Sequence, residues 1–110
     1  MGDRGHVLIE DNGVYLYSHW GASELVEIVK KALARRLRWD DPEYLARIIF
    51  CEMVKGQESE ETGFGIGTAK HEDVWRVVKV NCGDKTVTVE DNEKVEAKVS
   101  FEELIRVGFE

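Results

Sequence analysis

The dipeptide Asn12-Gly13 constrains the fold more than any other feature, because it divides the alternating segment 6–20 into two short strands. Asn and Gly readily adopt the positive φ angles of a type I′ turn, so the segment predicts a β-hairpin with a two-residue loop. Side chains alternate along a strand, and one face of this hairpin is apolar. The residues that this pattern assigns to the core are Val7, Ile9, Val14, Leu16 and Trp20.

The opposite face of the predicted hairpin carries the more reactive side chains. Counting outward from a two-residue turn sets them in opposed pairs, with Glu10 against Tyr15, Leu8 against Tyr17 and His6 against His19. Two imidazoles with Cβ atoms about 5 Å apart could bind a transition metal or carry protons near neutral pH. The alternative is that both lie at a half-exposed sheet edge and only hydrogen-bond to neighbours. A three-residue loop would shift the register by one and separate the pair.

A metal site here would need a third ligand, and no Cys or His stands at a zinc-like spacing. His71, Glu24 and Arg4 qualify only if folding brings them near, so no metal or cofactor is assigned. In a catalytic site, His19 would act as general base, oriented by Glu24 or Glu10. No established catalytic motif is present, so whether the chain is an enzyme stays open. The candidate site residues are His6, Tyr15, Tyr17, His19 and Glu24.

Two helices are expected after the hairpin. Residues 23–38 carry apolar side chains at helical spacing, with Ser23 as the candidate N-cap. Residues 40–56 begin with Asp40 or Asp41 as cap and Pro42 at the first helical position, and Gly56 marks the end. This second helix is apolar on more than one side. It is therefore either a central helix between the first helix and the sheet, or a helix with a second face buried in a homodimer.

The C-terminal part of the chain is rich in β-branched residues. Runs at 74–80, 85–91 and 93–100 predict three strands, and Ser100 with Glu103 has the spacing of a capping box before a final helix. With an extended segment at 62–68, the order is β-β-α-α-β-β-β-β-α. This order predicts an α+β fold, an antiparallel sheet with helices packed on one face. The length of 110 residues predicts a single domain, 1–110.

The extended segment reads TGFGIGT and invites comparison with nucleotide-binding loops. It lacks the Lys-Ser/Thr pair of a phosphate loop, and no helix follows it. As a strand, it would point Phe64 and Ile66 to the core and leave a bare glycine backbone on its other face. Bare backbone permits close approach by an aromatic side chain, a helix or a ligand, and packing is the interpretation that we favour.

Charge limits the classes of partner. The net charge of −7 argues against non-specific binding to DNA or to anionic membranes, which draws on an excess of Lys and Arg. The basic run 30–38 reads as a solvated helix face, except that Arg36 falls inside the apolar arc and needs a carboxylate. The nearest in sequence are Asp40, Asp41 and Glu43. We therefore expect a protein partner or a homo-oligomer and no nucleic acid.

Two further features concern the compartment. No apolar run approaches the ~20 residues that cross a bilayer, and the N-terminus lacks the order of a secretory signal. Cys51 and Cys82 are expected to be free thiols, as in cytoplasmic proteins. A cytoplasmic location and no membrane association are the expectations.

Three blocks, YLYSHWG, RWDDPEYLARIIF and ETGFGIG, occur in this order within the first two-thirds of the chain. They resemble a group of short prokaryotic and phage-encoded proteins that begin Met-Gly-x-Arg-Gly, for which no activity is established. The resemblance implies a cytoplasmic prokaryotic or phage-related protein, and no functional residue follows from it. We expect a non-enzymatic protein-interaction module, and the broadly apolar second helix is compatible with a homodimer. The alternative is a small metal-binding or hydrolase-like protein centred on His6 and His19.

Overall fold

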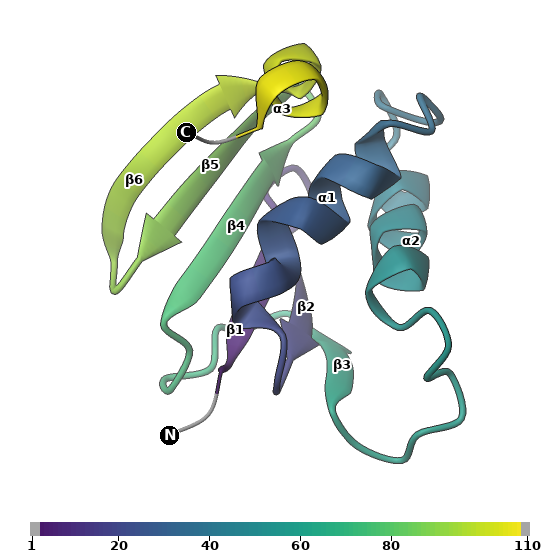
Figure 1. Cartoon of the computed structure of the whole chain (residues 1–110), viewed down its shortest axis with the longest axis vertical. Helices are drawn as coiled ribbons and strands as arrows, with labels where there is room; N and C mark the ends of the chain where they lie inside the picture. Colours follow the sequence, from purple (N-terminus) through teal and green to yellow (C-terminus); the bar gives the residue numbers. More distant parts are fainter. Residues whose placement is uncertain (1–2, 109–110) are drawn as a thin grey trace.

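The computed structural model describes residues 3–108, which form one six-stranded sheet and three α-helices on one face of it (Figure 1). The elements in chain order are β1 (Gly5–Ile9), β2 (Val14–Ser18), the 3-10 turn η1 (Ala22–Glu24), α1 (Leu25–Leu33), α2 (Pro42–Met53), β3 (Phe64–Gly67), β4 (Arg76–Asn81), β5 (Thr86–Asp91), β6 (Lys94–Ser100) and α3 (Phe101–Val107). The predicted α+β fold and its order of elements are confirmed.

The strands lie in the order β3-β2-β1-β4-β5-β6, so β3 and β6 are the two edges. Four of the five pairings are antiparallel, as predicted, whereas β1 and β4 run parallel at the centre of the sheet. The parallel pair arises because the chain returns from β3, at one edge, across β2 to the free side of β1. Sequence patterns within single strands carry no information about this long-range return.

The hairpin loop has four residues rather than the predicted two, since Ile9 opposes Val14. The amides of Asn12 and Gly13 both donate to the Ile9 carbonyl, at 3.3 and 2.9 Å, and Gly13 has a φ of 73°. Asp11 is excluded from the ladder because its carboxylate accepts hydrogen bonds from the amides of Cys82 and Gly83, at 2.7 and 3.0 Å.

The predicted register is therefore wrong by two residues. His6 opposes Tyr17 and not His19, and Leu8 opposes Tyr15 and not Tyr17. Because side chains alternate with a period of two, a shift of two keeps the residues of β1 and β2 on their predicted faces.

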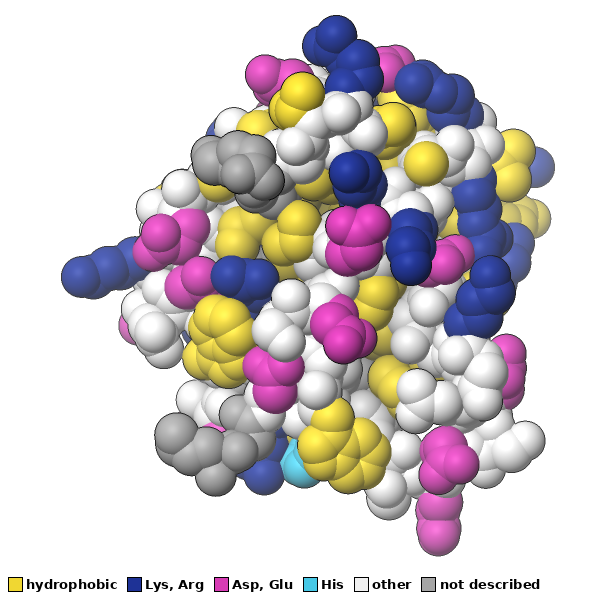
Figure 2. Space-filling view, in the orientation of Figure 1, with side chains coloured by type: hydrophobic (Ala, Val, Ile, Leu, Met, Phe, Trp, Pro, Cys, Tyr) yellow, Lys and Arg dark blue, Asp and Glu magenta, His cyan; other side chains and the backbone are white. Residues whose placement is uncertain are grey.

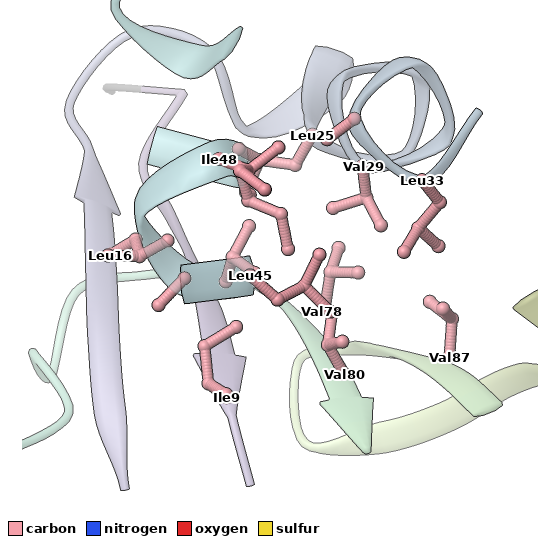
Figure 3. Close-up of a cluster of buried hydrophobic side chains, with 14 of the residues drawn as sticks. Ile9, Leu16, Leu25, Val29, Leu33, Leu45, Ile48, Val78, Val80 and Val87 are labelled. Carbon is pink, nitrogen blue, oxygen red and sulfur yellow. The ribbon is translucent and has the colours of Figure 1, made fainter. Parts of the chain in front are cut away.

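The core lies between the sheet and the helices. Figure 3 shows side chains from both layers meeting in one cluster, including Val29 and Leu33 of α1, Leu45 and Ile48 of α2, Ile9 of β1, and Val78 and Val80 of β4. Helix α1 packs against β1 and α2 against β2, so the two helices lie side by side. The prediction that the second helix lies between the first helix and the sheet is wrong. Its Tyr44 and Cys51 are exposed instead of being covered.

The helix termini follow the predicted signals in two cases out of three. The Asp41 carboxylate accepts from the amides of Glu43 and Tyr44 ahead of α2, with Pro42 as its first residue. Ser100 and Glu103 form the predicted capping box of α3. Ser23, in contrast, is not a cap, because it lies in η1 and donates its hydroxyl to Asp3 at 2.6 Å.

Helix α1 also ends at Leu33, short of the predicted residue 38. Arg36 and Arg38 beyond it have positive φ angles of 56° and 59°. The turned chain directs Arg36 to Glu102 of α3, with two hydrogen bonds of 2.8 and 2.9 Å. The predicted carboxylate partner exists, but it is not one of those near in sequence.

Both cysteines are free thiols, as predicted, with Cys51 exposed and Cys82 buried. Acidic and basic side chains are interspersed over the helix-covered face, with hydrophobic groups between them (Figure 2). Within residues 3–108, no helix combines the length and the apolar character needed to cross a membrane.

Candidate functional site

The three histidines of the chain gather with two tyrosines on the sheet face opposite the helices; we call His6, Tyr15, Tyr17, His19 and His71 the aromatic cluster. The ring of His6 lies edge-on to Tyr15, with centroids 4.8 Å apart, and His71 stacks on Tyr17 at 4.2 Å. Alternation along β1 and β2 directs the side chains of His6, Tyr15 and Tyr17 to this face. The connection from β3 to β4 returns across the face and adds His71.

His6 is the most enclosed member of the cluster, with 1% of its surface exposed. Its Nε2 accepts a hydrogen bond from the backbone amide of His71 at 3.0 Å. Burial, assisted by the charges of His71 and Lys70, lowers the pKa of His6 to about 4. The imidazole is therefore neutral at pH 7, with its proton on Nδ1 because Nε2 is an acceptor. That Nδ1 is buried and has no hydrogen-bond partner within residues 3–108.

A hollow of about 110 Å³ lies beside this histidine, between the tyrosines and β3. Gly65 opposes Tyr17 and Gly67 opposes Tyr15, so β3 presents bare backbone to the aromatic face, as predicted. A Cβ at Gly67 would meet nothing within 4 Å, and one at Gly65 would lie 3.9 Å from the Cβ of Tyr17. With a water molecule occupying ~30 Å³ of liquid, the hollow has room for a few waters or a small organic group.

His19 lies at the margin of the cluster. Its Nδ1 is 2.9 Å from the hydroxyl oxygen of Tyr17, and the Tyr17 ring separates it from the other two histidines. Burial raises the pKa of Tyr17, and Asp73 adds to this effect. Tyr17 therefore keeps its proton at neutral pH and can donate it to His19 in a hydrogen bond.

Trp20 does not lie in the core, and this prediction is wrong. Its side chain is 61% exposed, edge-on to His19, and covers Gly63. Strand β2 ends at Ser18, whose hydroxyl accepts the amide of Gly21 at 3.1 Å, so alternation no longer applies at residue 20. A Cβ at Gly63 would lie 2.6 Å from the Trp20 ring, and the φ of Gly63 is 104°, so this position requires glycine.

Glu24 does not line the hollow beside His6; it stands at the N-terminus of α1 and lines a different pocket, which Trp20 shares. Arg4 pairs with Asp73. Within residues 3–108, no group of three or more His, Cys, Asp or Glu side chains is placed to hold a metal ion. The structure thus brings His6, Tyr15 and Tyr17 together, connects His19 through Tyr17, and leaves Glu24 apart.

A second feature borders the same glycines. Among residues 3–108, strand β3 pairs only with β2, so its other side is a free sheet edge. Beside it, a groove of about 260 Å³ lies between β3 and α2, with Leu16, Phe50 and Ile66 among its walls and Glu43 and Arg47 at its rim. Ile66 points to the helix side as predicted, but it is 65% exposed, because α2 does not extend over the sheet edge. The edge position of β3 depends on strand order and was not predictable from its own residues.

Comparisons with family models, with curated proteins and with solved structures found no match.

Proposed function

We propose that this chain is a non-enzymatic protein-interaction module that binds an extended protein segment along the free edge of β3. The observation that supports the proposal is an unpaired strand edge directly beside an apolar groove. In strand addition, backbone hydrogen bonds supply affinity and pockets for alternate side chains supply specificity. The exposed Ile66 and the groove next to it provide such a pocket.

The two sheet edges differ in the features that prevent unwanted pairing. Strand β6 carries Lys94, Glu96 and Lys98, and charged side chains are a common means of protecting an edge. Strand β3 reads FGIG and has no charged residue. An apolar, uncharged edge left open favours use of β3 as a binding surface.

Peptide selection tests this proposal. A library of ten-residue peptides is selected against the purified chain, and the affinity of the selected peptides is then measured for Ile66→Lys. Val95→Lys on β6 is the matched control, because Val95 is 63% exposed and Ile66 is 65% exposed. We expect selected peptides to alternate in hydrophobicity, to slow amide exchange at Phe64 and Ile66, and to lose at least tenfold in affinity only with Ile66→Lys. Peptides that bind elsewhere on the chain, or failure to select any peptide from a chain that is monomeric, would refute the proposal.

The second candidate function is a small metal-binding or hydrolase-like protein centred on His6 and His19. The observation in its favour is the Tyr17–His19 hydrogen bond next to the hollow that His6 lines. NMR titration with and without Zn²⁺ tests it. Stoichiometric shifts at both histidines would support this function, whereas an unchanged spectrum would exclude the metal-binding form.

The resemblance of the three sequence blocks extends the proposal to a cytoplasmic protein of a prokaryote or a phage. This extension of the proposal is supported by the sequence alone. Detection of the chain in the cytoplasmic fraction of its host would test it.

A further inference from the structure

We infer that the segment bound at the β3 edge is β3 of a second copy of this chain, paired antiparallel with the register centred on Gly65. This inference rests on the proposed function, because it names the partner of the same edge. Its result is a twofold dimer in which two six-stranded sheets join into one. The backbone groups and the side chains of β3 support this pairing.

The backbone of β3 has its free groups at the right positions. The amide of His19 donates to the carbonyl of Gly63 at 2.9 Å, and Gly65 opposes Tyr17. Because hydrogen-bonding groups alternate along an antiparallel strand, the N–H and C=O of Phe64 and Ile66 point away from β2. Two copies centred on Gly65 set Phe64 opposite Ile66 of the partner subunit, and both pairs can then exchange two hydrogen bonds.

The side chains of β3 are self-complementary in this register. Phe64 and Ile66 both point to the helix side, so the twofold axis generates two identical Phe–Ile contacts. These contacts cover Ile66, which is 65% exposed in the single chain. On the aromatic face Gly65 opposes Gly65 of the partner subunit, so neither residue adds a side chain at the centre of the pairing. A symmetric interface needs such a patch, because the same surface serves on both subunits.

Mass measurement over a concentration series is the first test. Light scattering of the purified chain should show a mass that rises from 12.6 kDa towards twice that value as concentration increases. Ile66→Lys should remain monomeric throughout, and Val95→Lys, on the other edge strand and equally exposed, should behave as the parent. Circular dichroism verifies that both variants are folded. A parent that stays monomeric, or a dimer that survives Ile66→Lys, overturns the inference.

A disulfide test addresses the register. In a Cys51→Ser background, Gly65→Cys places two thiols on directly opposed residues, whose Cα atoms lie about 4.5 Å apart in a non-hydrogen-bonded pair and within disulfide range. Gly67→Cys is the matched control, because four residues of strand separate it from its counterpart by roughly 14 Å. Both sites have space for the added Cβ. Only Gly65→Cys should form an interchain disulfide under mild oxidation.

The outcomes separate this inference from the proposed function. If selected peptides bind β3 while the chain stays monomeric and Gly65→Cys stays reduced, the dimer is refuted and the interaction function stands. If neither peptides nor a second copy occupy β3, both fail. A disulfide formed equally by Gly67→Cys would refute the centred register.

Discussion

The buried His6 makes the stability of the fold dependent on pH. Its pKa is about 4 in the folded chain, from an ordinary value of 6.5. A depressed pKa means that the unfolded chain binds the proton more tightly, so stability falls as the pH is lowered through this interval. The full difference between the folded and unfolded pKa values of His6 corresponds to about 3 kcal/mol in the free energy of unfolding. About 2 kcal/mol of this should already be lost between pH 7 and pH 5.

The perturbation that tests this is His6→Gln, which removes the titrating group and keeps an oxygen that can accept from the His71 amide. Urea unfolding at pH 7, 6 and 5, followed by tryptophan fluorescence, gives the free energy of unfolding at each pH. The parent should lose about 2 kcal/mol over this range, His6→Gln should lose little, and the control His19→Gln should follow the parent.

The other titratable groups are present in both chains, so the difference in pH slope between the parent and His6→Gln isolates this histidine. Among the carboxylates, burial raises the pKa of Asp11, but hydrogen bonds from the amides of Cys82 and Gly83 outweigh it and lower the pKa overall. Equal pH slopes in the parent and His6→Gln, or an NMR titration of His6 near 6.5, would refute the reasoning.

Three further outcomes follow from burial. Ile49→Asp should destabilise the fold by several kcal/mol in urea unfolding, because Ile49 is fully buried. Cys51→Asp, on the exposed side of α2, should change the stability by less than ~1 kcal/mol. Equal effects of the two substitutions would contradict the assigned helix face. Trp20→Ala should lower the free energy of unfolding by roughly 1 kcal/mol and not by the ~3–5 kcal/mol of a core aromatic, since Trp20 is 61% exposed. A loss in the higher range, measured by calorimetry, would show that Trp20 lies in the core. Ellman's reagent should modify Cys51 but not Cys82 in the native chain, because burial raises the pKa of Cys82 to about 12, and fast reaction of two thiols would show that Cys82 is accessible.

The strand faces were predictable because they depend on local alternation alone. His6, Tyr15 and Tyr17 were assigned to one face, and the structure places them there even though the loop length was wrong. The loop length was not predictable, because the carboxylate of Asp11 accepts hydrogen bonds from the amides of Cys82 and Gly83, which are distant in sequence. Contacts with residues 71 and 72 positions away thus determine a local turn.

The placement of Trp20 and Ile66 shows where alternation stops being informative. Trp20 follows the end of β2, and Ile66 lies on the correct side of a strand that no helix covers. The stacking of His71 on Tyr17 likewise depends on the return of the chain across the sheet. The positions of Ile66 and His71 are determined by strand order, which the sequence pattern alone does not specify, whereas that of Trp20 is determined by the turn after Ser18.

Strand β3 serves both candidate features, yet their chemical determinants are separable. The hollow depends on the side chains of His6 and the tyrosines and on the absence of Cβ atoms at Gly65 and Gly67. Pairing at the free edge depends on the backbone N–H and C=O groups of Phe64 and Ile66, which lie in the plane of the sheet and point away from β2. A substitution that fills the hollow, such as Gly67→Ala, therefore leaves strand pairing intact. Loss of one property with retention of the other would show which of them the glycines of β3 serve.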